Sequence, residues 1–256
     1  MDEFREEREA LKNANFKTKW QYFLDYYKWP VIITVAIVIS AISIIYTIIT
    51  AKDYALNGYF LNTYADTDKS EAFQEILCED LGIDSSKYMI YIDNSLNFTR
   101  GSFDESTYAS SQKIMATMAA SDTDFLAADE DAFAYYATTD TFFELREIYT
   151  DEELTEYSEY IYYIDMDAVR ARSEAAADYN PDLDITIFDQ YDHFAPEEMS
   201  DPIPIAFCIE DSAKLEGTYY FREGHMLLGI PANTQRLDTV KQFVAYLLEE
   251  PAEGGM

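Results

Sequence analysis

The pattern of hydrophobic positions is dominated by one apolar run that begins at Pro30 and ends at Ile49. Its twenty residues carry no charge. Because an α-helix rises about 1.5 Å per residue, the run spans roughly 30 Å, the thickness of a bilayer's hydrocarbon core. Its polar members have hydroxyls that can bond to helix carbonyls of the preceding turn: Thr34, Ser40, Ser43 and Thr47. The pattern predicts one transmembrane helix over residues 30–50, with the lipid bilayer as its partner.

A cleaved signal peptide is the alternative interpretation of this run. A signal has an apolar core of about 7–15 residues that is followed by a small-residue cleavage site. Here the run is longer, about thirty residues precede it, and residues 47–52 contain no A-x-A site. No cysteine follows the run closely enough for a lipid anchor. We therefore expect an uncleaved helical anchor.

The segment before the span has an aromatic face with helical spacing (i, i+4, i+7, i+8, i+11), formed by Phe16, Trp20, Phe23, Leu24 and Tyr27. Aromatic rings with a polar edge favour the headgroup layer of a membrane. Residues 16–29 are therefore predicted to form an interfacial helix that leads into the span. The alternative is a helix that packs on the cytoplasmic domain of a partner protein.

Charge predicts the orientation. Lys17, Lys19 and Lys28 precede the span closely, whereas Lys52 alone follows it closely, so the positive-inside rule places residues 1–29 in the cytoplasm. Residues 51–256 then form an extracytoplasmic domain at a cell membrane. The first fifty residues carry six basic and six acidic side chains, so the formal charge of −31 belongs to this domain. Such a charge repels phosphate and excludes nucleic acid as a partner.

Beyond the span, strand and helix patterns alternate. Strands are expected at 55–63, 87–93 and 124–128, separated by helices at 67–81, where Gly82 marks the end, and at 105–120. This order is typical of a parallel α/β sheet. Further elements are expected in the second half of the chain: helices at 130–137, 167–177 and 235–250 (the last capped by Asn233 or Thr234), a short element at 142–149, strands at 159–165, 184–188 and 202–208, and a strand pair formed by 219–221 and 226–230.

The residues that could carry chemistry form no recognisable motif. Cys78 and Cys208 either stay free as small buried side chains or form one disulfide. His193 and His225 lie in unrelated segments, so no zinc site is expected. Carboxylates cluster at 66–68, 122–124, 129–131 and 165–167, either as calcium ligands or, as we favour, as helix caps and solvated surface. The sequence predicts no catalytic residue, no metal and no cofactor.

Four stretches resemble the type II periplasmic-binding-protein-like fold of the solute-binding components of ABC importers. They are DFLAADEDAFAYYA, FFELREIY, DPIPIAFCIED and HMLLGIPANTQRLDTVKQFVAYLL. The resemblance implies an α/β fold with a lobe completed by the C-terminal part of the chain and a reduced second lobe at roughly 140–205. The lead KWQYFLDYYKWPV into the span also resembles that of single-span proteins of Clostridia-type Gram-positive bacteria.

The same resemblance implies a ligand cleft at the carboxyl ends of the parallel strands. By position, the candidate ligand-binding residues follow the first and third strands: Asn62, Thr63, Tyr64, Asp129, Glu130 and Asp131. The alternative is that they are ordinary loop and helix-capping residues. A group of tyrosines in the middle of the chain could line an aromatic ligand surface or be half-buried core: Tyr157, Tyr160, Tyr162 and Tyr163.

These features predict a membrane-anchored extracytoplasmic binding or interaction domain that is not an enzyme. It would act as an accessory or sensory subunit, with a small-molecule ligand, a membrane-protein partner, or both. A helix-tethered solute receptor of an ABC importer is the first alternative, and a surface hydrolase is the second.

Overall fold

The structure is a computed structural model that describes residues 15–26, 28–102, 104–137, 141–177, 192–222 and 224–249. The chain divides into two compact units, Met1–Lys52 and Asp53–Met256. The strand expected at 184–188 lies outside the described residues.

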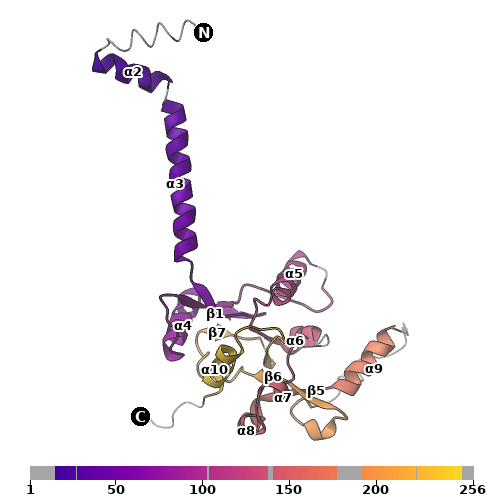
Figure 1. Cartoon of the computed structure of the whole chain (residues 1–256). Helices are drawn as coiled ribbons and strands as arrows, with labels where there is room; N and C mark the ends of the chain where they lie inside the picture. The colour runs from indigo at the N-terminus through magenta and orange to yellow at the C-terminus, as the bar shows by residue number, and fades with distance from the viewer. Residues whose placement is uncertain are drawn as a thin grey trace. The chain divides into compact units, whose positions relative to one another are not determined.

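The described residues of the first unit form helices α2 (Phe16–Tyr26) and α3 (Lys28–Thr50) (Figure 1). On α2 the rings of Phe16 and Trp20 stack with centroids 6.4 Å apart, and those of Trp20 and Phe23 at 5.7 Å. This stacking confirms that these aromatic residues share one helical face. All three rings are exposed.

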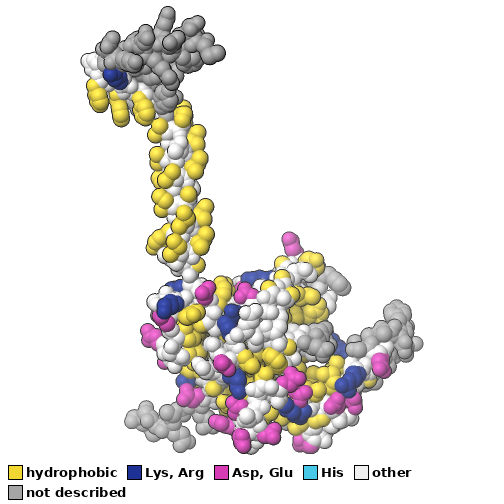
Figure 2. Space-filling model, viewed as in Figure 1, with side chains coloured by type: hydrophobic (Ala, Val, Ile, Leu, Met, Phe, Trp, Pro, Cys, Tyr) yellow, Lys and Arg dark blue, Asp and Glu magenta, His cyan; other side chains and the backbone are white. Residues whose placement is uncertain are grey.

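Helix α3 is long and apolar enough to cross a membrane. None of its residues is buried, and Figure 2 shows apolar side chains along its visible face. The Thr34 hydroxyl donates to the Pro30 carbonyl at 2.8 Å, and Thr47 donates to Ser43 at 3.0 Å, so these polar groups are satisfied within the helix. The helix therefore has the length and composition that match the hydrocarbon core of a membrane.

The second unit is a mixed α/β fold built on a six-stranded sheet of order β3-β1-β4-β8-β6-β5. The strands of this sheet are β1 (Asp53–Phe60), β3 (Tyr88–Asp93), β4 (Phe125–Asp129), β5 (Ile161–Asp165), β6 (Pro202–Cys208) and β8 (Met226–Gly229). A separate antiparallel pair contains β2 (Tyr64–Ala65) and β7 (Tyr219–Tyr220). The helices of eight or more residues are α4 (Thr67–Asp80), α5 (Glu105–Ala119), α6 (Glu130–Ala137), α9 (Met166–Ala177) and α10 (Leu237–Leu248). The shorter helices within the described residues are α7 (Leu145–Ile148), α8 (Asp151–Glu156), η1 (Ser158–Tyr160) and η3 (Pro196–Glu198).

The parallel part of the sheet confirms the strand–helix–strand prediction. Strand β1 pairs in parallel with β3 on one side and with β4 on the other. Helix α4 ends as expected, because Gly82 adopts φ +66°, a conformation that glycine accepts without strain.

The remaining strands are antiparallel, and one prediction about them was wrong. Residues 219–221 and 226–230 do not pair with each other. Strand β7 pairs with β2, whereas β8 enters the main sheet between β4 and β6 and runs antiparallel to both. Sequence proximity favoured a local hairpin, but β8 is buried along its whole length and fits only the middle of a sheet.

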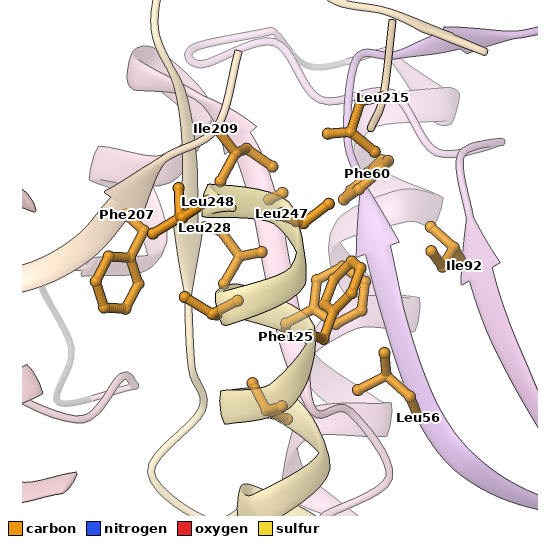
Figure 3. Packing of buried hydrophobic residues seen from close by; sticks show 14 of the residues in the cluster. Leu56, Phe60, Ile92, Phe125, Phe207, Ile209, Leu215, Leu228, Leu247 and Leu248 are labelled. Carbon is orange, nitrogen blue, oxygen red and sulfur yellow. The ribbon is translucent and has the colours of Figure 1, made fainter. Parts of the chain in front are cut away.

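Both faces of the sheet are covered by helices, so alternate residues of each strand enter different cores. On β4, Phe125 and Ala127 belong to one buried cluster, and Leu126 and Ala128 to the other. The first cluster includes residues of α4 and α10, and the second includes residues of α5 and α6. In Figure 1, α4 and α10 lie to one side of the sheet, and α5, α6 and α9 to the other. Figure 3 shows side chains of the strands converging with Leu247 and Leu248 of α10.

Three local expectations can now be compared with the structure. Helix α10 begins after Arg236 and has no side-chain cap, so neither Asn233 nor Thr234 caps it. Thr234 instead donates to the carboxylate of Asp124 at 2.6 Å. Both cysteines are buried and free, so the free alternative is confirmed. Asp66 caps α4 by accepting from the amide of Lys69, as favoured for that acidic cluster.

Close packing across β1 and β4 gives a first testable prediction. Gly58 lies opposite Phe125, and a Cβ atom on Gly58 would lie 2.4 Å from carbon atoms of that ring. Because the ring is fully buried and cannot withdraw, Gly58→Ala is expected to destabilise the unit by about 1–3 kcal/mol. Urea unfolding followed by circular dichroism measures the change. Combining Gly58→Ala with Phe125→Leu is expected to cost less than the sum of the two single changes; additive costs would contradict the proposed clash.

Candidate functional site

A cavity of about 410 Å³ lies on the face of the sheet that carries α6 and α9. Its volume is within the range of small-molecule sites, roughly 300–1,000 Å³. The apolar part of its lining is Phe133, Ala134, Ala137, Tyr162, Ile164, Val169 and Phe194. The polar part of its lining is Arg100, Glu130, Asp131, Asp165, Arg172, Asp192, His193 and His225.

The aromatic wall of the cavity is fixed by ring contacts. The Tyr162 ring stacks on His193 with centroids 4.5 Å apart, and Phe194 meets Tyr162 edge-on at 5.8 Å. His193 Nδ1 lies 2.7 Å from the Tyr163 carbonyl oxygen, which holds the imidazole in place. The Phe133 ring meets Tyr162 edge-on at 6.4 Å and stacks on Phe142 at 4.9 Å. The apolar surface is therefore formed before any ligand arrives.

One carboxylate of the lining is held by the backbone. Asp165, at the end of β5, accepts from the amides of Asp167, Ser200 and Asp201 at 3.0–3.2 Å. Burial alone would raise the pKa of this carboxyl group, but these donors hold it below its ordinary value. Asp165 is therefore a fixed negative charge on the cavity wall. In all, the described lining has four carboxylates and two guanidinium groups, so acidic side chains outnumber the permanently cationic ones on the cavity wall.

A second polar group adjoins the cavity through His225, formed by Cys208, Glu210 and His225. The Cys208 thiol donates to Glu210 Oε2 at 2.7 Å, and His225 Nδ1 lies 2.6 Å from Glu210 Oε1. The Cys208 Sγ atom is 3.5 Å from the same Nδ1. The backbone amide of Met226 also donates to Glu210 Oε2, at 3.1 Å.

Each of these three groups is electrostatically perturbed. The hydrogen bond to Glu210 raises the pKa of His225. Burial raises the pKa of the Glu210 carboxyl group, but its bonds with Cys208 and His225 outweigh burial and lower it overall. Burial, together with the neighbouring Glu210 charge, raises the pKa of the Cys208 thiol.

The sequence-predicted ligand-binding residues do not all lie in one hollow. Glu130 and Asp131, in the first turn of α6, line the cavity. Asp129 does not line it: its carboxylate accepts from the amide of Ala132 at 2.9 Å and from Asn62 Nδ2 at 2.6 Å. The structure thus brings Asn62 and Asp129 together through a hydrogen bond, and Asp129 serves as a helix-capping group.

Asn62, Thr63 and Tyr64 line a different and more open hollow of about 630 Å³, beside Tyr220. Asn62 exchanges hydrogen bonds with the backbone of Phe98, which fixes the turn after β1. The Thr63 hydroxyl donates to the Leu61 carbonyl, whereas Tyr64 is 71% exposed. Their role in ligand binding stays a prediction.

The tyrosine group also separates. Tyr162 lines the cavity, whereas the three others pack against the core cluster on the opposite face of the sheet: Tyr157, Tyr160 and Tyr163. Alternation along β5 explains this, because Tyr162 and Tyr163 point to opposite faces.

The sequence interpretation missed His193, Cys208, Glu210 and His225. The available signal was the i, i+2 spacing of Cys208 and Glu210 at the end of a strand pattern, with His225 directly before another strand pattern. This signal identifies a site only if β6 is known to pair with β8. The expected hairpin of 219–221 with 226–230 assigned the second strand a different partner.

Comparison with known proteins found no matching protein-family model, no matching curated protein and no matching solved structure. The fold and the site therefore define the class: a mixed α/β domain with an apolar helix near the N-terminus and an amphipathic cavity.

Proposed function

We propose that this protein is a membrane-anchored, non-enzymatic binding domain that captures a small amine-bearing organic molecule outside the cytoplasm. The observation that carries the proposal is the cavity: an aromatic and aliphatic wall faces a rim with an excess of carboxylates. An apolar body would desolvate against Phe133, Tyr162 and Phe194, and an ammonium group would be attracted to Glu130 and Asp131.

The anchor and its orientation are part of the proposal. Helix α3 is long and apolar enough to span a membrane, and the three lysines before it favour a cytoplasmic N-terminus. The acidic unit Asp53–Met256 would then face outwards on a bacterial cell membrane of the Gram-positive type. Figure 2 shows carboxylates scattered over the visible face of this unit, which suits a solvated exterior.

A solute-binding-protein-like fold of type II, with a reduced second lobe near 140–205, remains our interpretation of the architecture. Two features support it: β3-β1-β4 are parallel, and β8 from the C-terminal part of the chain completes the same sheet. In this interpretation the natural partner is another membrane protein, either a transporter that receives the solute or a complex that senses it.

A ligand screen on the full-length protein in detergent micelles tests this proposal. The probes are apolar amino acids, short apolar peptides and aryl alkylamines, each paired with its N-acetylated form, which lacks the cationic amine. Binding to the folded state raises its stability by about 2.7 kcal/mol at a ligand concentration 100 times the Kd. We expect a saturable rise in Tm with the amines and none with the acetylated forms.

Two variants test whether the rise in Tm comes from binding in the cavity. Ala134 lines it, so Ala134→Phe is expected to fill the space and abolish the rise in Tm. Ala116→Phe places the same side chain on the exposed surface of α5 and is expected to leave the rise intact. A flat screen on cooperatively unfolding wild-type protein, or a rise that survives Ala134→Phe, would overturn the proposal.

A further inference from the structure

We infer that Cys208, Glu210 and His225 form a binding site for one transition-metal ion of the zinc class. The inference is independent of the proposed solute, because the three ligand groups meet through the pairing of β6 with β8. Each of the three side chains offers one ligand atom, and these three atoms lie within 4.8 Å of one another. Within the described part of the chain, this is the group of three or more such side chains that meets that distance.

Strand register explains why the three side chains meet. Strands β6 and β8 are antiparallel, with Cys208 opposite Leu227. The amide of Ile209 donates to the Met226 carbonyl at 2.9 Å, so the pairing continues past the end of β6 and sets Glu210 opposite His225. Because side chains alternate along a strand, Cys208, Glu210 and His225 point to the same face of the sheet.

The distances fit a tetrahedral ion. With Zn–S near 2.3 Å and Zn–N near 2.0–2.1 Å, two such ligands of a tetrahedral ion lie about 3.5 Å apart. Cys208 Sγ and His225 Nδ1 are 3.5 Å apart. Glu210 lies closer to both, at 2.7 and 2.6 Å, so its carboxylate must move back by about 1 Å to admit the ion. Its side chain is 22% exposed, so neighbouring atoms do not enclose it completely.

The ligand set selects the metal class. A thiolate and an imidazole favour zinc and its neighbours over Mg²⁺ and Ca²⁺, which take oxygen ligands. Three protein ligands leave the fourth tetrahedral position for water or a bound molecule. Because His225 lines the cavity and its side chain is 43% exposed, the ion has a path from solvent.

The surroundings would support such an ion. The Met226 amide holds Glu210 Oε2, and the Phe194 ring meets the His225 ring at 4.8 Å, so two of the three ligands are oriented by neighbours. A cysteine–histidine catalytic relay is a weaker interpretation. In such a relay the nucleophile and the orienting carboxylate use different ring nitrogens, whereas here both approach Nδ1.

Cobalt and zinc binding test the inference. Full-length protein in detergent micelles is stripped with a chelator under reducing conditions and titrated with Co²⁺ or Zn²⁺. We expect one ion per chain, a thiolate-to-cobalt charge-transfer band in the near ultraviolet, and the visible bands of a four-coordinate cobalt ion. Cys208→Ser and His225→Asn are each expected to weaken zinc binding at least about 100-fold, since even supporting groups around a metal contribute 10–100-fold.

Matched variants separate a lost ligand from a lost fold. Cys78→Ser alters the other buried cysteine, and His193→Asn alters the other histidine of the cavity; both are expected to keep the cobalt spectrum. Glu210→Gln keeps the size of the side chain and is expected to weaken zinc binding while thermal unfolding stays cooperative. Wild-type protein that binds no stoichiometric ion, or a thiolate band that survives Cys208→Ser, overturns the inference. These readouts report the ion itself, so they stand whether or not the solute screen succeeds.

Discussion

Replacing Asp124 by alanine is expected to destabilise the unit Asp53–Met256 by about 3–5 kcal/mol, the range observed when one partner of a buried ion pair is removed. Asp124 is fully buried directly before β4. Its carboxylate accepts from Arg236 Nε at 2.7 Å, from the backbone amide of Asn57 at 2.8 Å and from the Thr234 hydroxyl at 2.6 Å. Its loss would leave three donors without their acceptor.

This network joins distant parts of the chain, which is why its loss is expected to be costly. Asn57 belongs to β1, Asp124 precedes β4, and Arg236 directly precedes α10. Arg236 also donates to the Asp122 carbonyl at 3.3 Å. Arg236→Ala is therefore expected to cost nearly as much as Asp124→Ala, because it leaves a fully buried carboxylate without its cationic partner. The double variant is expected to cost less than the sum of the two.

An exposed ion pair of similar geometry provides the control. Arg170 contacts Asp167 and Asp201 at 3.1 Å, but its side chain is 61% exposed. Arg170→Ala is expected to cost less than about 1 kcal/mol, because water screens such pairs. Urea unfolding of the full-length protein in micelles compares the variants. Equal losses for Arg170→Ala and Arg236→Ala would contradict the role assigned to Asp124.

Phe243→Ala is expected to have an effect of the same size, about 3–5 kcal/mol, through a different mechanism. Phe243 is fully buried on α10, and its ring lies 4.9 Å from that of Phe125 on β4. Removing it leaves a cavity between the helix and the sheet that neighbouring side chains fill only in part.

The neighbouring residue gives the matched control for this change. Gln242 lies on the same helix and is exposed, so Gln242→Ala is expected to alter stability by no more than about 0.5 kcal/mol. Thermal and urea unfolding measure both variants. If the two changes had similar small effects, α10 would not be packed on the sheet as described.

Much of the fold could be predicted from the sequence where the signal is local. The apolar run at 30–49, the alternation of strands and helices from 53 to 129 and the amphipathic pattern of α10 each depend on neighbours within about one turn or one strand. Parallel pairing of β1 with β3 and β4 followed from that alternation, because a helix between two strands brings them into one sheet in the same direction.

The antiparallel half could not be predicted in the same way. Strand β8 is four residues long and pairs with β4, almost one hundred residues earlier in the chain. Nothing within β8 specifies that partner, whereas the nearby β7 offered a plausible hairpin. The Cys208–Glu210–His225 group depends on the pairing of β6 with β8, so it was missed for the same reason. Glu130 and Asp131, which line the cavity, could be named from the sequence because they directly follow a strand that could be predicted.

The central position of β8 has a consequence for how the protein is made. Until residues 226–229 leave the ribosome and reach their place, β4 and β6 each have an unpaired edge in the middle of the future sheet. The folded unit therefore cannot close during synthesis of its first 170 or so residues, and its nascent chain must be kept from pairing with others.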